Sequence, residues 1–81
     1  MDFPESLGVI IETPGFLTQY TGFKNLEILA DMNGRISKAD IRIVLKRVGL
    51  DPDMKKPVGK YSLGMRQRLG IAQAIMEDPL F

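Results

Sequence analysis

Three hydroxyl residues, Thr21, Ser37 and Ser62, each precede a stretch in which apolar residues recur at helical spacing, and this pattern constrains the fold more than any other feature. A hydroxyl in that position accepts a hydrogen bond from a free amide in the first helical turn, so it marks a helix start. The pattern predicts three helices: one over about residues 23–32, one from Ser37 to Gly49, and one from Ser62 to about Glu77.

The second of these segments carries the clearest local signals. Ser37 to Asp40 resembles a capping box, with Asp in place of the usual Glu. Asn33-Gly34 supplies a stop for the first helix, and Asp78-Pro79 ends the third. The apolar stripes that should face a core are Ile41, Val44, Leu45 and Val48 in the second helix, and Leu69, Ala72, Ile75 and Met76 in the third.

The residues before the first helix have a different character. Leu7 to Ile11 is a short apolar run, typical of a strand buried on both faces, and the chain offers it no clear partner. Between the second and third helices, Asp51-Pro52 predicts a single further turn, and residues 58–61 an extended or irregular stretch. We therefore expect a mainly α structure of three to four helices with a short N-terminal β-segment, cut from a larger α/β domain.

Composition excludes several kinds of chemistry. The chain has no Cys and no His, which rules out disulfides, thiolate nucleophiles, the usual zinc sites and His-based acid–base catalysis within it. Its formal net charge is +1, and the Lys and Arg residues are spread along the sequence. Because nucleic-acid binding usually requires a basic stripe, we expect no nucleic-acid partner.

The stretch around Ser62 combines a hydroxyl, a helix start and a glycine. Free amides and the helix dipole at such a start attract anions, phosphate included, and Gly64 lets a ligand approach the backbone closely. On this chemistry alone, a plain helix cap is the commoner explanation for Ser62. Arg66 and Arg68 follow on the same helix, where solvated arginines are commoner than phosphate ligands.

The same stretch resembles the signature segment of ABC transporter ATPases, whose usual form is Leu-Ser-Gly-Gly-Gln followed by a helix containing Gln-Arg. Tyr61 takes the Leu place, Ser62 the Ser, Leu63 the first Gly, Gly64 the second Gly and Met65 the Gln, and Gln67-Arg68-Leu69 continue the match. The resemblance implies that Ser62, Leu63, Gly64 and Met65 contact ATP held mainly by a second copy of the subunit. Leu63 and Met65 depart from the usual pattern, so the side-chain amide of Gln is missing.

A second stretch supports the same family. Residues 11–16 and 21–26 are similar to the bacitracin-resistance and lantibiotic-immunity type of ABC exporter ATPase. Glu12 then stands where the family has the Q-loop Gln, which helps to bind metal or water and senses the membrane subunit. The alternative for Glu12 is a solvated loop carboxylate. The resemblance divides the chain into a strand and Q-loop region (7–22), a helical subdomain (23–61) and the signature with its helix (62–79).

The phosphate-binding loop of such ATPases has no counterpart in the sequence. At the sole Gly-Lys pair, Gly59-Lys60, Met54 stands where the first Gly belongs and Tyr61 where Ser or Thr belongs. No catalytic residue and no metal ligand is therefore assigned to this chain. The resemblance implies ATP and Mg²⁺ in the parent dimer, no cofactor for the chain alone, and no ATP hydrolysis by it.

The family resemblance also implies a membrane partner. Phe16, Tyr20 and Phe23 are the candidates for contact with a transmembrane permease subunit, which would hold the protein at the cytoplasmic face of the membrane, its sole membrane contact. Residues 58–60 are a further candidate contact. Aromatic residues in so small a bundle are more often part of the core, so that alternative stays open.

Two other functions remain open. Three short helices with a Gln- and Arg-rich third helix resemble a helix-turn-helix DNA-binding domain. Against it stand the near-zero net charge, the buried-strand segment and Gly70, which is expected to interrupt the third helix. A stand-alone protein-interaction bundle with no nucleotide role is the other alternative.

Overall fold

The structure is a computed structural model that describes residues 16–78. Its order of elements is α2 (Gly22–Asn33), α3 (Lys38–Arg47), the short 3-10 helix η1 (Val58–Lys60) and α4 (Leu63–Glu77). The expected strand at 7–11, the Q-loop position Glu12 and the final residues 79–81 lie outside the described residues. Within 16–78 the mainly α prediction is confirmed, with three α-helices at the expected places.

The helices begin and end where the capping residues indicate. Thr21 Oγ1 accepts a hydrogen bond from the amide of Lys24 (3.1 Å), and Gly34 ends α2 at φ 75°, a left-handed conformation that suits glycine. Ser37 and Asp40 form the predicted capping box of α3.

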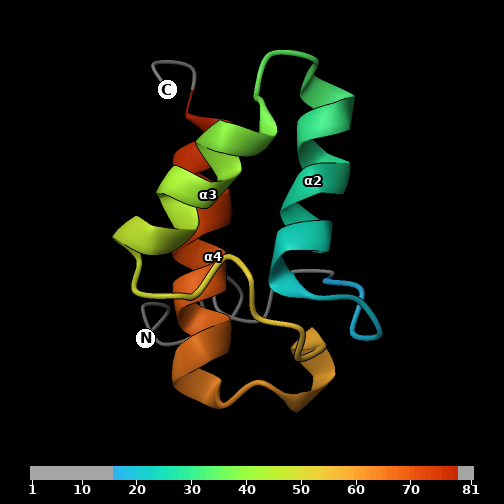
Figure 1. Cartoon of the computed structure of the whole chain (residues 1–81), viewed down its shortest axis with the longest axis vertical. Helices are drawn as coiled ribbons and strands as arrows, with labels where there is room; N and C mark the ends of the chain where they lie inside the picture. Colours follow the sequence, from blue (N-terminus) through green and yellow to red (C-terminus); the bar gives the residue numbers. More distant parts are fainter. Residues whose placement is uncertain (1–15, 79–81) are drawn as a thin grey trace, which may run out of the picture.

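The three helices stand beside one another (Figure 1). α2 and α3 form a hairpin, and α4 runs along both of them. The connection from α3 crosses the lower half of the molecule and reaches η1 and then the start of α4. A turn closes at the expected Asp51-Pro52, where the Met54 amide donates to the Asp51 carbonyl (3.1 Å).

Two expectations, one about residues 58–60 and one about the third helix, were wrong. Residues 58–60 form a 3-10 turn, because the amides of Lys60 and Tyr61 donate to the carbonyls of Pro57 (2.9 Å) and Val58 (3.0 Å). Gly70 does not interrupt α4, which is continuous from Leu63 to Glu77. A glycine inside a helix costs only about 1 kcal/mol, and the burial of α4's apolar face outweighs that.

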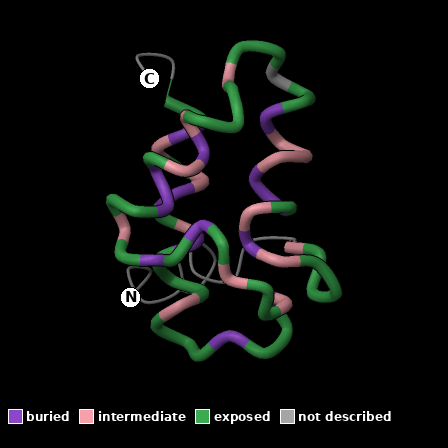
Figure 2. The backbone as a smooth tube through the Cα atoms, in the orientation of Figure 1, coloured by how far each residue is buried: buried purple, intermediate pink, exposed green. Residues whose placement is uncertain are grey.

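The core lies where the three helices face one another (Figure 2). Helices α3 and α4 contribute most of their predicted stripes, α2 contributes two residues, and the connection adds three more. The buried apolar residues are Leu26 and Ala30 in α2, Ile41, Val44 and Leu45 in α3, Leu50, Val58 and Tyr61 between helices, and Leu69, Ala72 and Met76 in α4. Val48 and Ile75, also predicted for the stripes, are partly buried against this cluster.

None of the helices that the structure describes is long and apolar enough to cross a membrane.

We predict that Leu26→Ala lowers the free energy of unfolding by about 2–5 kcal/mol, because Leu26 is 0% exposed and its removal leaves a cavity. Met32→Ala, on the same helix at an 80% exposed position, is the matched control and should change stability by less than about 0.5 kcal/mol. Urea denaturation followed by circular dichroism measures both. Equal effects of the two variants would contradict the described core.

Candidate functional site

The start of α4 presents most of the predicted signature to solvent. Ser62 is exposed, Leu63 is 66% exposed, and Gly64 is exposed, with only Ser62 Oγ, at 4.0 Å, near the position a Cβ would take. Met65 differs, because its side chain packs against the hydrophobic core. The four residues therefore form one turn, with three facing outward and one facing inward.

Hydrogen bonding at this turn leaves two amides available. Ser62 Oγ accepts from the amide of Met65 (3.1 Å), and the Ser62 carbonyl accepts from the amide of Arg66 (3.0 Å). The amides of Leu63 and Gly64 come earlier in the helix, where no intrahelical acceptor exists. Ser62 therefore caps α4, and its hydroxyl proton can still be donated to a further acceptor.

The starts of α3 and α4 differ in charge. In α3, Asp40 Oδ2 accepts from the amide of Ser37 (3.0 Å), which places a carboxylate at the helix start. In α4, Met65 occupies the corresponding position and the first turn carries no acidic residue. The positive end of the α4 dipole is therefore left open, and an anionic group such as a phosphate fits it better than it fits α3.

Arg66 braces the approach to this turn. Its Nη2 donates to the carbonyl of Gly59 (3.1 Å), so this exposed arginine ties α4 to η1. This contact goes beyond the solvated position predicted for Arg66, and no local sequence pattern predicts it. Arg68 is exposed, and it lies near Gly49 at the end of α3.

Tyr61, directly before the signature serine, is buried. It is 7% exposed, and its Oη accepts a hydrogen bond from the amide of Gly22 (3.1 Å) at the start of α2. Burial raises the pKa of the Tyr61 phenol, and the Gly22 N–H opposes that rise. The sequence predicts Tyr61 only as a member of the signature, since nothing local predicts a partner 39 residues away.

Asn25 is the other buried polar residue that sequence analysis missed. It is 7% exposed and holds the segment before α2: its Oδ1 accepts from the Leu17 amide (2.7 Å), and its Nδ2 donates to the carbonyls of Leu17 (3.0 Å) and Thr21 (2.9 Å). These bonds satisfy its polar atoms, as burial requires. Residues 17–21 are consequently fixed to the first turn of α2.

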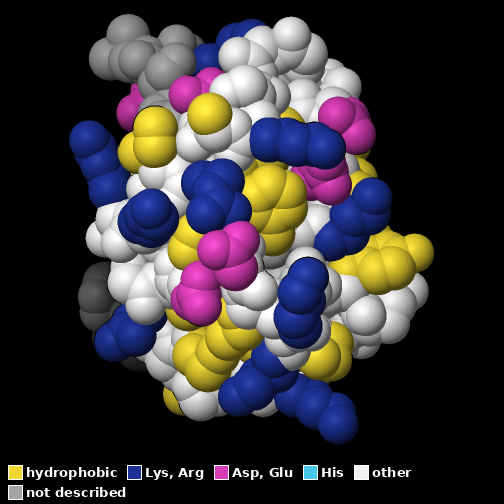
Figure 3. Space-filling view, viewed as in Figure 1, with side chains coloured by type: hydrophobic (Ala, Val, Ile, Leu, Met, Phe, Trp, Pro, Cys, Tyr) yellow, Lys and Arg dark blue, Asp and Glu magenta, His cyan; other side chains and the backbone are white. Residues whose placement is uncertain are grey.

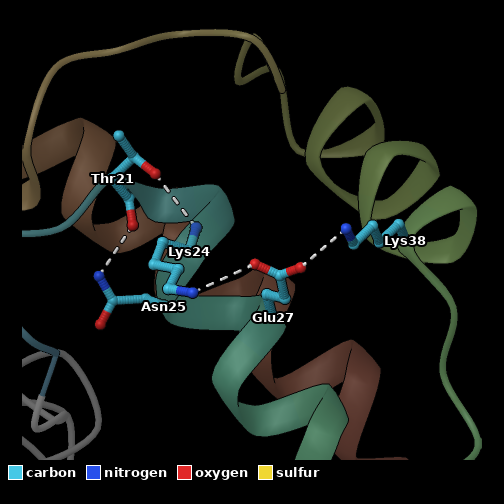
Figure 4. A network of polar contacts seen from close by, with 5 residues as sticks. All are labelled: Thr21, Lys24, Asn25, Glu27 and Lys38. Atoms are coloured by element: carbon cyan, nitrogen blue, oxygen red, sulfur yellow. Dashed lines mark hydrogen bonds and ion pairs between the residues drawn. The ribbon is translucent and has the colours of Figure 1, made fainter.

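Charged side chains beside Asn25 join α2 to α3 (Figure 4). Glu27 lies between two lysines, with Oε1 at 3.7 Å from Lys24 Nζ and Oε2 at 3.4 Å from Lys38 Nζ. Both lysines are exposed, so the energetic contribution of these ion pairs is small.

The aromatic candidates for partner contact divide into two kinds. Phe16 and Phe23 are partly buried and pack against the core, as the core alternative predicted, while Tyr20 is 41% exposed. Leu17, which sequence analysis did not single out, is 40% exposed beside them. The segment therefore offers an apolar surface whose base is anchored in the core.

A hollow of about 260 Å³ adjoins this surface. Its lining includes an ion pair in which Arg42 Nη1 lies 2.7 Å from Asp53 Oδ1 and Arg42 Nη2 lies 3.2 Å from Asp53 Oδ2. That hydrogen bonding and charge lower the pKa of Asp53 and raise the pKa of Arg42. The residues that line the hollow are Thr21, Phe23, Arg42, Pro52, Asp53, Met54 and Lys55.

On the face seen in Figure 3, Lys and Arg side chains surround several apolar patches.

Metal ligands are not gathered anywhere in the part of the chain that the structure describes. No group of three or more Asp and Glu residues is arranged there to hold an ion.

We predict that the chain loses stability above about pH 10, because the pKa of Tyr61 in the folded state is raised above its ordinary value of about 10. The neutral phenol is favoured in the fold, so this contribution is complete below the unfolded pKa and disappears as the pH rises through the folded pKa. Tyr61→Phe should make the decline shallower. Urea denaturation from pH 8 to 11 measures this, and identical slopes for the two chains would contradict it.

Comparison with known proteins identifies the relatives of this chain. A family model described as ABC transporter matches residues 1–81. The bacitracin transport ATP-binding protein BcrA of Enterococcus faecalis is 52% identical over 73 residues, which are 90% of this chain and 24% of that protein. BcrA of Bacillus licheniformis is 49% identical over the same shares of both chains. The lantibiotic transport ATP-binding protein SrtF of Streptococcus pyogenes is 38% identical over 90% of this chain and 31% of its own length.

No solved structure matches the chain. The chain spans about a quarter to a third of the length of these curated relatives. Their names agree with the exporter type that the residues around Glu12 and Phe23 resemble. The family resemblance is confirmed: the chain belongs to the ABC transporter family, among its ATP-binding subunits.

Proposed function

We propose that the chain is the helical part of a longer ABC transporter ATP-binding subunit. In this proposal the start of α4 closes over ATP held by a second copy of the subunit, and the surface before α2 contacts the transmembrane permease. The permease thereby holds the subunit at the cytoplasmic face of the membrane. The division into residues 7–22, 23–61 and 62–79 is part of the same proposal, with Glu12 at the Q-loop position.

The open positive end of α4 is the observation that carries the nucleotide role. Two free amides, the Ser62 hydroxyl and the positive end of the helix dipole meet on this exposed turn. In α3 the carboxylate of Asp40 compensates the dipole, whereas α4 has Met65 in the corresponding position and no acidic residue in its first turn. The γ-phosphate of ATP is an anion that such a turn stabilises. Gly64 is exposed and carries no side chain, so a phosphate can approach the backbone there closely.

In this proposal the site is composite, because the phosphate-binding loop that holds the ATP belongs to the second copy of the subunit. In P-loop ATPases the phosphate-binding loop contains a Lys that follows a Gly and precedes a Ser or Thr. This loop binds the phosphates and helps to position Mg²⁺. Bound Mg²⁺ neutralises charge on the transferred phosphoryl group. The residues of this chain then bind and orient the nucleotide from the other side, and the chain alone has no hydrolytic activity.

The proposed permease contact rests on the anchored apolar surface before α2. Leu17 and Tyr20 are exposed there, while Phe16 and Phe23 reach into the core. Asn25 fixes the backbone of this segment to α2, so a movement of a partner bound to the segment would be passed on to α2. No observation on residues 16–78 favours the DNA-binding or stand-alone interaction alternatives.

We predict that Ser62→Ala lowers the ATPase rate of the full-length subunit in its transporter by about 10–100-fold, the effect of removing one hydrogen bond to a charged group. Ser37→Ala is the matched control, because each serine caps a helix through the amide three residues later, at 3.1 Å for Ser62 and 3.2 Å for Ser37. Both variants should lose about 1 kcal/mol of stability, and only the first should lose activity. Equal ATPase rates in the two variants would refute the nucleotide role.

We predict that Tyr20→Ala weakens binding of the full-length subunit to its permease by about tenfold or more, since exposed aromatic residues often dominate such contacts. Ile71→Ala, on the outer side of α4 at a 55% exposed position, is the control and should bind normally. Co-purification and titration of detergent-solubilised permease with labelled subunit measure the difference. Unchanged affinity for Tyr20→Ala would place the permease contact elsewhere.

A further inference from the structure

Two segments far apart in the sequence lie side by side beneath the helices. One is 17–22, which leads into α2 and carries the apolar surface, and the other is 57–61, which leads into α4 (Figure 1). Three contacts join them: the amide of Val58 to the carbonyl of Tyr20 (2.9 Å), the amide of Gly59 to the carbonyl of Thr18 (2.9 Å), and an antiparallel bridge between Thr21 and Pro57.

Tyr61 completes this junction with a side chain. Its hydroxyl accepts from the Gly22 amide, which as the first amide of α2 has no acceptor within its own helix. The fit is close, because a Cβ at Gly22 would lie 2.7 Å from Tyr61 Oη and 3.1 Å from Leu69 Cδ1. A glycine is therefore needed opposite this phenol.

We propose that Tyr61 is a positioning residue that fixes the orientation of the signature serine relative to the permease-contacting surface. This inference rests on the function proposed above. Tyr61 stands directly before Ser62, and its hydroxyl is held by the first residue of α2. A displacement of residues 17–22 is transmitted through that bond to the turn that faces ATP.

The rigidity of both sides makes the transmission effective. Asn25 holds residues 17–21 to α2 through side-chain hydrogen bonds, and Arg66 holds η1 to α4 through the Gly59 carbonyl. The junction between them consists of backbone bonds and the one phenol. Loss of the hydroxyl leaves the Gly22 amide buried without its acceptor, which weakens the junction at its point nearest Ser62.

The first test compares Tyr61→Phe with the unaltered full-length subunit, alone and assembled with its permease. We expect the ratio of permease-stimulated to basal ATPase to fall about fivefold, the change that corresponds to one ordinary hydrogen bond. Ser37→Ala, which removes a side-chain hydrogen bond at the start of α3, should keep the ratio of the unaltered protein. An unchanged ratio in Tyr61→Phe would overturn the inference.

The second test measures position directly. Gln19→Cys, exposed in the segment before α2, and Gln67→Cys, exposed on α4, accept spin labels in a cysteine-free full-length subunit, and the distances are measured without permease. The distribution of distances between the labels should broaden in Tyr61→Phe and stay narrow in Ser37→Ala. Equal widths in these two variants would also overturn the inference, whatever the ATPase result.

The third test uses the close approach at Gly22. Gly22→Ala should reduce the stimulated ATPase strongly when Tyr61 is present, because the new methyl group collides with the hydroxyl oxygen. In the Tyr61→Phe background that oxygen is absent, so Gly22→Ala should cause a smaller further loss. Additive effects of the two changes would show that the contact is not the link.

Failure of this inference is distinguishable from failure of the proposed function. If Ser62→Ala retains full ATPase activity, the nucleotide role fails, and the inference fails with it. If Ser62→Ala loses activity while Tyr61→Phe keeps both its stimulation ratio and its narrow distances, the nucleotide role stands and only the inference is refuted.

Discussion

Burial of one face of α4 against α2 and α3 is the interaction on which the rest of the structure depends. Leu69, Ala72 and Met76 are each no more than 1% exposed, and they lie along the length of the helix. A buried side chain of the size of Leu or Met contributes roughly 1.5–3 kcal/mol. Because this stripe fixes α4 as a rigid rod, the turn at its start has a defined position relative to the other two helices.

Polar contacts then orient the ends of the rod. Asn25 and Tyr61 are both buried, and each satisfies a backbone group that helix geometry or a loop would otherwise leave without a partner. Apolar packing alone would bring α2 and α4 together, but it would not determine how the segments that precede these two helices align with each other. The hydrogen bonds of Asn25 and Tyr61 determine this alignment, so the apolar surface before α2 and the signature turn have a fixed position relative to each other.

The sequence was sufficient for the helices because their signals are local. Thr21, Ser37 and Ser62 cap them, and apolar stripes give each a buried face. The 3-10 turn at 58–60, the burial of Tyr61 and the role of Asn25 depend on residues elsewhere in the fold, so no local pattern predicted them. Ser62 shows the same limit for the site: its capping bond matches that of Ser37, so the cap by itself does not set the two serines apart.

The junction of residues 18–21 with 57–59 also bears on the order in which the chain folds. The hairpin of α2 and α3 needs only contacts that are close in sequence, whereas the bond between Gly22 and Tyr61 spans 39 residues. Closing such a long loop costs conformational entropy, and distant contacts of this kind form slowly. We therefore expect the hairpin of α2 and α3 to form first during folding and the signature turn to reach its final position last. Pulse-labelling hydrogen exchange would then show the Gly22 amide, which donates to Tyr61, becoming protected late.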